Sequence, residues 1–231
     1  MLTTTSPVCT ALSSALLACL SVAGAPSALA AAVTPVTYDL PNGDGLAHGG
    51  SYNYWDKAYT GSGNTTTDGA ALSGGHGDLT DGVVATQNWF NTENAEGTGP
   101  YVAWRGIDPT IVFHFAGGTH LSSITLHADD ANGAGGVHAP GGITIGGTSY
   151  SFADPAGSAP NTFTVDGLDL VGQDFAVTIH ARNTDSWTFV SEVTFEAAAV
   201  PEPAHWALAL AGLGTVATWR RSRAQRASAL S

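Results

Sequence analysis

Several tryptophans of this 231-residue chain stand next to polar residues, which is the combination that sugar binding requires. Sugar C–H groups stack on an indole face, while sugar hydroxyl groups form directed hydrogen bonds with neighbouring polar side chains. Trp104 and Arg105 end an expected strand, and Trp187 follows a polar turn at 183–185. The candidate ligand-binding residues are Trp55, Trp89, Arg105 and Trp187. The alternative is that most of these rings belong to the protein core.

Two adjacent carboxylates, Asp129 and Asp130, precede an Asn-Gly turn and could serve acid–base catalysis or a second cation site. Because neighbouring loop residues seldom converge, we expect a solvated acidic turn instead. The sequence also contains no Gly-x-Ser-x-Gly, His-Glu-x-x-His or phosphate-binding loop. No catalytic residues are therefore predicted, and the chain is expected not to be an enzyme.

Three histidines stand at polar positions of separate expected strands: His114, His127 and His180. If those strands are neighbours, the imidazoles could converge on a metal ion. We favour the alternative, in which each ring lies at the surface or forms a hydrogen bond of its own.

The charged residues are unevenly distributed along the chain. The span 31–200 contains three basic residues, Lys57, Arg105 and Arg182, against 18 acidic ones, which gives a net charge of −15. Nucleic-acid binding depends on Lys and Arg side chains that meet phosphates, so this balance excludes nucleic acid as a partner. The same charge favours solubility outside the cell and is compatible with cation binding.

Alternating apolar and polar residues dominate from residue 110 onward and predict strands. The alternating runs are 111–115, 124–127, 175–180 and 187–196, and further strands are expected near 33–40, 101–104, 143–152 and 162–165. Glycine-containing pairs such as Asn-Gly and Pro-Gly mark the turns. About eight short strands predict an all-β fold, a single β-sandwich or jelly roll over 31–199. Within it, 31–78 is expected to hold a strand and a long Gly-, Thr- and aromatic-rich loop region.

Several short motifs resemble those of the discoidin-like family, also known as factor 5/8 type C or galactose-binding-like domains. They are Leu79-Thr80-Asp81-Gly82 followed by Thr86 and Trp89, the strand 111–115 and the closing segment 190–195. The resemblance covers about residues 79–195, and Trp89 lies one residue further from Asp81-Gly82 than is usual in that family. It implies an eight-stranded jelly roll of the kind found in carbohydrate-binding modules and bacterial surface proteins.

The same resemblance implies a structural calcium ion held by Asp81, Thr86 and Glu192. The residue types are suitable, because calcium binds about six to eight oxygen atoms drawn from carboxylates and carbonyls. A glycine after the aspartate also lets the backbone turn its carbonyl groups inward. The alternative is a turn aspartate, a capping threonine and a glutamate that faces water.

Residues 1–30 have the features of a secretory signal peptide. The stretch 8–30 is apolar or small and uncharged, and small residues at positions 28 and 30 predict cleavage after Ala30. No Lys or Arg precedes the apolar stretch, which departs from the usual signal. Both cysteines, Cys9 and Cys19, fall in this segment, so a mature chain from residue 31 has no thiol chemistry.

Residues 200–226 combine a Pro-Glu-Pro turn, an apolar segment at 204–219 and a basic tail. As a helix the apolar segment spans about 24 Å, against roughly 30 Å of hydrocarbon in a bilayer, so it is a short transmembrane anchor. This order of parts resembles the PEP-CTERM sorting signal of Gram-negative bacteria. The resemblance implies that an exosortase recognises Pro201, Glu202 and Pro203 and cuts there, and it associates the protein with exopolysaccharide and biofilm. An ordinary single-pass anchor is the alternative.

Together these features predict an exported, non-enzymatic protein of the cell surface or extracellular matrix. We expect it to be anchored in the membrane transiently, to be processed by an exosortase and to bind extracellular polysaccharide. A small secreted glycan-active enzyme is one alternative, and it would need two facing carboxylates. A purely structural component of a biofilm matrix is another.

Overall fold

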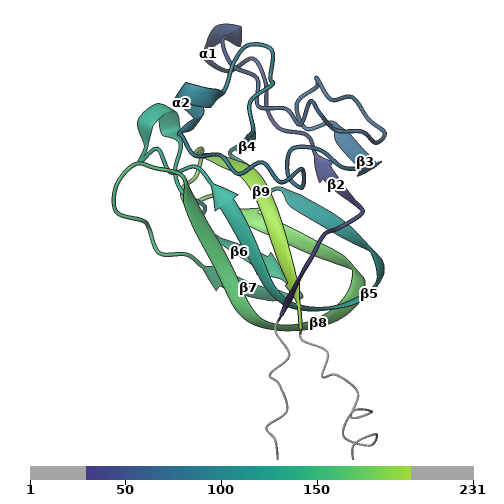
Figure 1. The fold of residues 1–231 in the computed structure, drawn as a ribbon. Helices are drawn as coiled ribbons and strands as arrows, with labels where there is room; N and C mark the ends of the chain where they lie inside the picture. The colour runs from purple at the N-terminus through teal and green to yellow at the C-terminus, as the bar shows by residue number, and fades with distance from the viewer. Residues whose placement is uncertain (1–29, 199–231) are drawn as a thin grey trace, which may run out of the picture.

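The computed structural model describes residues 30–198 (Figure 1). This part of the chain is built from strands and three very short helical segments, which confirms the predicted all-β fold. The strands are β1 Ala31–Val33, β2 Thr37–Pro41, β3 Ala71–Gly75, β4 Val102–Arg105, β5 Thr110–Ala128, β6 Gly142–Ile145, β7 Thr148–Ser151, β8 Asn161–His180 and β9 Trp187–Ala197. The helical segments are α1 Ala47–Gly50, α2 Trp89–Thr92 and a 3-10 turn at Ala134–Gly136.

No helix within residues 30–198 is long and apolar enough to cross a membrane. The expected signal peptide, apart from Ala30, lies outside the described residues, and so does the sorting signal at 200–226 with its segment 204–219.

The strands of the described region pair antiparallel and form one sheet that curls into two layers. β5 and β8, with 19 and 20 residues, run through both layers, and their pairing is interrupted between His114 and Thr119. On one side of this interruption β5 lies between β8 and β2, and on the other side it lies between β8 and β9. The sequence pattern predicted these two strands as four short ones, because Gly117, Gly118 and Gly172 break the alternation.

Alternate side chains of the long strands point between the layers and form the sandwich core. The Phe113 and Phe195 rings meet edge to face with centroids 4.8 Å apart, and Phe115 meets Phe195 at 5.3 Å. Tyr38 of β2 closes the core beside Phe113, with centroids 5.8 Å apart. The period-two pattern of the sequence thus becomes one continuous apolar layer.

The segment between β2 and β4 packs on one end of the sandwich, where α1 and α2 lie (Figure 1). Its rings Tyr54 and Tyr59 are buried. Tyr54 belongs to a second group of buried side chains, which we call the loop-end cluster. This cluster consists of Tyr54, Ala85, Trp89, Tyr101, Ala103, Ala131, Val137 and Phe189.

The first and last described strands leave the domain side by side. Ala31 of β1 pairs with Ala197 of β9, and Figure 1 places these ends opposite α1 and α2. β9 has 11 residues and therefore separates the two ends of the sandwich by about 33 Å. The described ends of β1 and β9 therefore lie on the side of the domain away from α1 and α2.

Candidate functional site

A hollow of about 400 Å³ opens at the loop end of the sandwich. Four segments line it: the chain around α1, the end of β4, the glycine-rich turn after β5 and the turn that leads into β9. The lining residues are Gly45, Leu46, Ala47, His48, Arg105, Gly135, Gly136, Asp185 and Trp187. We call this hollow the tryptophan pocket. Two of the four predicted ligand-binding residues, Arg105 and Trp187, therefore line the same hollow.

Arg105 and Trp187 stand opposite each other in the β4–β9 ladder, which places both side chains on one face. The Arg105 backbone N–H donates to Asp44 Oδ2 at 2.8 Å, and Arg105 Nε donates to the Asp185 carbonyl at 3.4 Å. Arg105 is exposed, and among the described residues neither of its terminal nitrogens has a hydrogen-bond partner. A permanently charged guanidinium therefore offers donors to a ligand in the pocket.

Trp187 is half-buried and is held by the loop-end cluster. Its ring meets Tyr54 edge to face, with centroids 5.1 Å apart, and lies 5.8 Å from Phe189. The Trp187 carbonyl accepts a hydrogen bond from the His138 N–H at 3.3 Å. These contacts hold the Trp187 indole in place before a ligand binds. Binding therefore avoids the entropic cost of ordering this side chain.

Trp89 lies behind the lining of the pocket. It is 6% exposed, and the His48 ring stacks on it with centroids 5.5 Å apart and planes 12° apart. A Cβ added at Gly135 would lie 2.5 Å from Trp89 Cζ2, and Gly135 has φ +66°, so this position requires glycine. The structure thus gives Trp89 a supporting position beneath His48 and Gly135.

Trp55 lies beside the pocket and does not line it. The ring is half-buried and packs against Gly45, which does line the pocket. Trp55 Nε1 donates to Asp68 Oδ1 at 2.7 Å, so its polar atom already has a partner.

Backbone strain gathers around the tryptophan pocket. The four non-glycine residues of the described region with positive φ are Leu46, His48, Asn132 and Asp185, and three of them line the pocket. Such conformations cost about 1–3 kcal/mol each and concentrate at ligand-binding sites. His48 and Asp185 were not predicted as site residues. The only signals for them in the sequence were the following glycines at 49–50 and the polar turn at 183–185.

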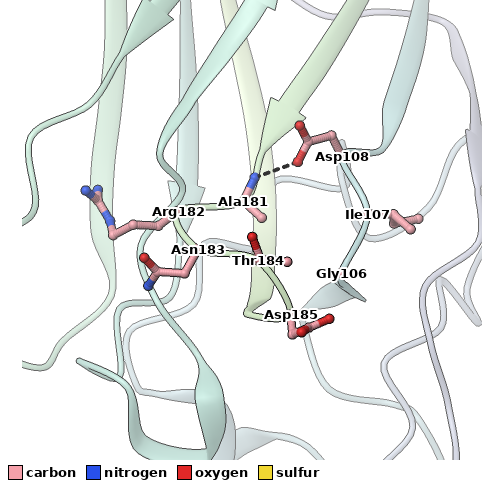
Figure 2. Close-up of a pocket in the computed structure, with 8 residues that line it drawn as sticks. All are labelled: Gly106, Ile107, Asp108, Ala181, Arg182, Asn183, Thr184 and Asp185. Carbon is pink, nitrogen blue, oxygen red and sulfur yellow. Dashed lines mark hydrogen bonds between the residues drawn. The ribbon is translucent and has the colours of Figure 1, made fainter.

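A second hollow, of about 500 Å³, shares Asp185 with the tryptophan pocket, and Figure 2 shows the residues that line it. Its lining is the segment Gly106–Asp108 on one side and the turn Ala181–Asp185 on the other. Asp108 accepts hydrogen bonds from the Ala181 N–H at 2.9 Å and from His180 Nδ1 at 2.8 Å. The guanidinium of Arg182 points away from this hollow and donates to the carbonyls of Ala139 and Pro140. We call this hollow the turn pocket.

Two of the three predicted calcium ligands, Asp81 and Glu192, lie on segments that a hydrogen bond joins. Glu192 of β9 is 5% exposed, and its Oε2 accepts a hydrogen bond from the Gly82 N–H at 3.0 Å. Asp81 forms a local turn in which its Oδ1 accepts the Val83 N–H at 2.8 Å, while Thr86 is exposed. Burial and the charge of Asp81 raise the pKa of Glu192 to about 7. Within residues 30–198 no three His, Cys, Asp or Glu side chains gather as a metal site, so a calcium ion here would also need carbonyl oxygens.

The expectation of a solvated turn at Asp129 and Asp130 was wrong, because both side chains are buried. The segment that contains α2 folds over this turn. Asp129 Oδ2 accepts the Trp89 N–H at 2.8 Å, and Asp129 Oδ1 accepts Asn88 Nδ2 at 2.7 Å. Asp129 therefore fixes the start of α2 beneath the pocket and is not arranged for acid–base catalysis.

The three histidines have separate partners, as the favoured alternative predicted. His114 bridges strands by contacts with Asp174 at 2.7 Å and Asp39 at 3.3 Å, which raises its pKa. His180 bonds to Asp108, and His127 lies 3.3 Å from Thr162 Oγ1. No shared metal site forms among them in the described part of the chain.

Two further carboxyl groups are buried near the loop-end cluster without a cationic partner in the described region. Burial, together with neighbouring carboxylates, raises the pKa of Asp78 to about 8 and that of Glu93 to about 8. Glu93 Oε1 accepts the Tyr101 N–H at 3.0 Å, whereas its Oε2 is buried and has no partner. No sequence pattern indicated that these groups are buried, since each lies in a polar loop.

No protein-family model matches this chain, and a comparison with curated proteins found no match. Solved structures similar to it include a truncated AlyQ with CBM32 and alginate lyase domains, at a TM-score of 0.43 and 10% identity. That match covers 76% of this chain, which spans about a third (35%) of the AlyQ chain. Another is GH31 CBM32-2 bound to GalNAc, at a TM-score of 0.33 and 14% identity, covering 59% of this chain and 95% of the module.

A third similar structure is the family 32 CBM of NanJ from Clostridium perfringens in complex with galactose. Its TM-score is 0.27 at 10% identity, and the match covers 43% of this chain and 79% of the module. These neighbours are carbohydrate-binding modules, alone or attached to an enzyme. Because their TM-scores lie below 0.5, they carry no argument about the ligand of this chain, and the all-β assignment rests on the strands themselves.

Proposed function

We propose that this protein is exported to the cell surface or extracellular matrix and binds extracellular polysaccharide there without altering it. The observation that carries the proposal is the tryptophan pocket, which a fixed indole and an arginine line together, the terminal nitrogens of the arginine having no partner among residues 30–198. An indole face stacks on sugar C–H groups, and a guanidinium donates hydrogen bonds to ring and hydroxyl oxygens. Carbohydrate is therefore the ligand class that fits this lining best.

The arrangement of carboxylates supports binding over hydrolysis. A glycosidase uses two carboxyl groups, one of which must be protonated to act as an acid. Asp108 and Asp185 both line the turn pocket. Burial acts to raise the pKa of Asp108, but the hydrogen bonds from His180 and Ala181 outweigh it, and the pKa is lowered. Asp108 is thus held as a carboxylate, which does not suit a proton donor.

The direction of the chain ends supports presentation at a surface. Residues 31 and 197 pair at the end of the domain opposite α1, and α1 contributes to the lining of the tryptophan pocket. A transient membrane anchor at 204–219 would then leave the pocket facing away from the membrane. Export after cleavage at Ala30 and processing by an exosortase at Pro201, Glu202 and Pro203 complete the proposal, and fractionation of native cells tests it. Intact chain in the cytosol would overturn it.

A structural calcium ion is part of the proposal. Asp81 and Glu192 belong to two elements that the Gly82–Glu192 hydrogen bond joins, and an ion between them would offset two negative charges. Thr86 lies on the same loop and would supply a further oxygen. When bound, the ion would fix the loop that follows Leu79 against β9.

Removal of either side chain of the tryptophan pocket tests the proposed function. We expect Arg105→Ala and Trp187→Ala to weaken binding to a polysaccharide at least about 10-fold, equivalent to about 1.4 kcal/mol. Affinity electrophoresis against a panel that includes the exopolysaccharide of the producing organism measures this. Lys57→Ala is the matched control, since it removes an exposed cation outside the pocket.

The same panel separates the alternatives. Absence of binding to every polysaccharide would favour a purely structural matrix protein. Release of short oligosaccharides during long incubation would favour the glycan-active enzyme. If Arg105→Ala binds as tightly as the unmodified protein, the tryptophan pocket is not the site.

A further inference from the structure

The tryptophan pocket and the turn pocket meet at Asp185. Asp185 lines both, and Arg105 of the first is followed directly by Gly106 of the second. We propose that they form a single groove that binds several consecutive sugars of an uncharged polysaccharide. This inference rests on the proposed function and adds to it the length and the charge class of the ligand.

Asp185 stands at the junction of the two pockets. The Asp185 backbone has φ +63°, a left-handed conformation that bends the chain just before β9 begins. The Asp185 carbonyl accepts Arg105 Nε, and a Cβ added at Gly106 would lie 3.5 Å from Asp185 Oδ1. Asp185 therefore lies beside the end of β4. From this position its side chain reaches a sugar bound in either pocket.

The combined size of the two pockets fits an oligosaccharide. The two pockets measure about 400 and about 500 Å³, and sites for small ligands span roughly 300–1,000 Å³. Either pocket alone accommodates a small ligand such as one sugar ring. Together they extend along the turn at 181–185 and leave space for neighbouring units of the same chain.

The two pockets offer complementary contacts. The tryptophan pocket supplies an indole face and a guanidinium, whereas the lining of the turn pocket includes the polar residues Asn183 and Thr184. Both of these turn side chains are exposed, and within residues 30–198 neither makes a side-chain hydrogen bond. They are available to a ligand because the fold does not use them.

The charges around the groove disfavour an acidic polysaccharide. Asp108 and Asp185 line the groove against a single guanidinium, that of Arg105, since Arg182 turns its guanidinium away from the turn pocket. The described residues carry 18 acidic and three basic side chains, a net charge of −15, which repels a polyanion before contact. A chain of uncharged sugars meets no such barrier.

A length series of oligosaccharides tests the proposal. The probes are neutral oligomers of glucose, galactose, mannose and N-acetylglucosamine, each from one to six units, together with oligomers of uronic acids. The intact protein is titrated with each by isothermal calorimetry. We expect affinity for a neutral series to rise at least 10-fold between one and four units, and the uronic acid series to bind at least 10-fold more weakly.

The double variant Asn183→Ala/Thr184→Ala locates the added affinity. This variant should lose most of the 10-fold rise in affinity between one and four units. Its affinity for the single sugar should stay within about 2-fold of that of the unmodified protein. Gln173→Ala is the control, because Gln173 is exposed on β8, outside both pockets. Thermal unfolding of both variants should match that of the unmodified protein, since none of the three side chains is used by the fold.

The outcomes separate this inference from the proposed function. Equal affinity for one and four units, or a length gain that survives in the double variant, overturns the groove but leaves sugar binding in the tryptophan pocket. Tighter binding of the uronic acid series overturns the charge class. Absence of binding by every probe and every polysaccharide overturns both proposals together.

Discussion

The sandwich core and the loop-end cluster are both rich in aromatic rings, yet they differ in almost every other respect. The sandwich core consists of apolar side chains that alternate along strands, such as Phe113 and Phe195. The loop-end cluster gathers rings from four separate segments and has buried carboxyl groups beside it. Trp89 Nε1, Glu93 Oε2 and Asp130 Oδ2 all lie there, buried and without a partner in the described region.

This difference indicates a division of roles within one small domain. Apolar packing between strands stabilises a fold at little cost in polar desolvation. Buried polar atoms without a hydrogen-bond partner and strained backbone conformations lower the stability of a fold. They are retained where they position the residues of a functional site. We therefore attribute stability chiefly to the sandwich core and place the proposed ligand recognition at the loop end.

The largest expected effect is the loss of a core ring. Phe113→Ala should destabilise the fold by about 3–5 kcal/mol, because it removes a fully buried side chain and leaves a cavity. The melting temperature should fall by roughly 10 °C or more in thermal unfolding. Phe90→Ala, at a half-exposed ring of the loop end, is the control and should change it by only a few degrees. A Trp187→Ala variant less stable than Phe113→Ala would contradict the division of roles.

A smaller effect is expected from calcium. Excess calcium over EDTA should raise the melting temperature by several degrees, since an ion at 100 times its dissociation constant contributes about 2.7 kcal/mol. Glu192→Gln should abolish this shift, whereas Glu196→Gln, at an exposed position of the same strand, should retain it. No shift with the unmodified protein would show that Asp81, Thr86 and Glu192 hold no ion.

The smallest effect concerns a buried carboxyl group. The pKa of Glu93 is raised to about 8, chiefly by burial, so folding favours its protonated form. Its stabilising contribution is complete below its ordinary pKa near 4.5 and is lost as the pH rises towards 8. Glu93→Gln should therefore raise the melting temperature by a few degrees at pH 8.5 and hardly at all at pH 4.

Glu96→Gln provides the control for this comparison, because it removes an equal charge from an exposed side chain. A pH profile of stability that Glu93→Gln leaves unchanged would mean that Glu93 is ionised in the folded protein at neutral pH.

The sequence predicted part of the candidate site. Arg105 and Trp187 were recognised by residue type and by their places next to a strand end and a polar turn. His48 and Asp185 were not, because a histidine among glycines and an aspartate in a turn are common in loops without a function. The buried state of Asp129 was also missed, since it depends on α2, which lies 40 residues earlier in the chain.

What the sequence determined by itself is the all-β class and the inward face of each strand. Alternation with a period of two is a local property, so it is readable residue by residue. Only the tertiary structure decided that β5 and β8 run through both layers and that four distant segments meet at the tryptophan pocket. Contacts between such segments depend on how the sheet curls, and no spacing along the chain records that curvature.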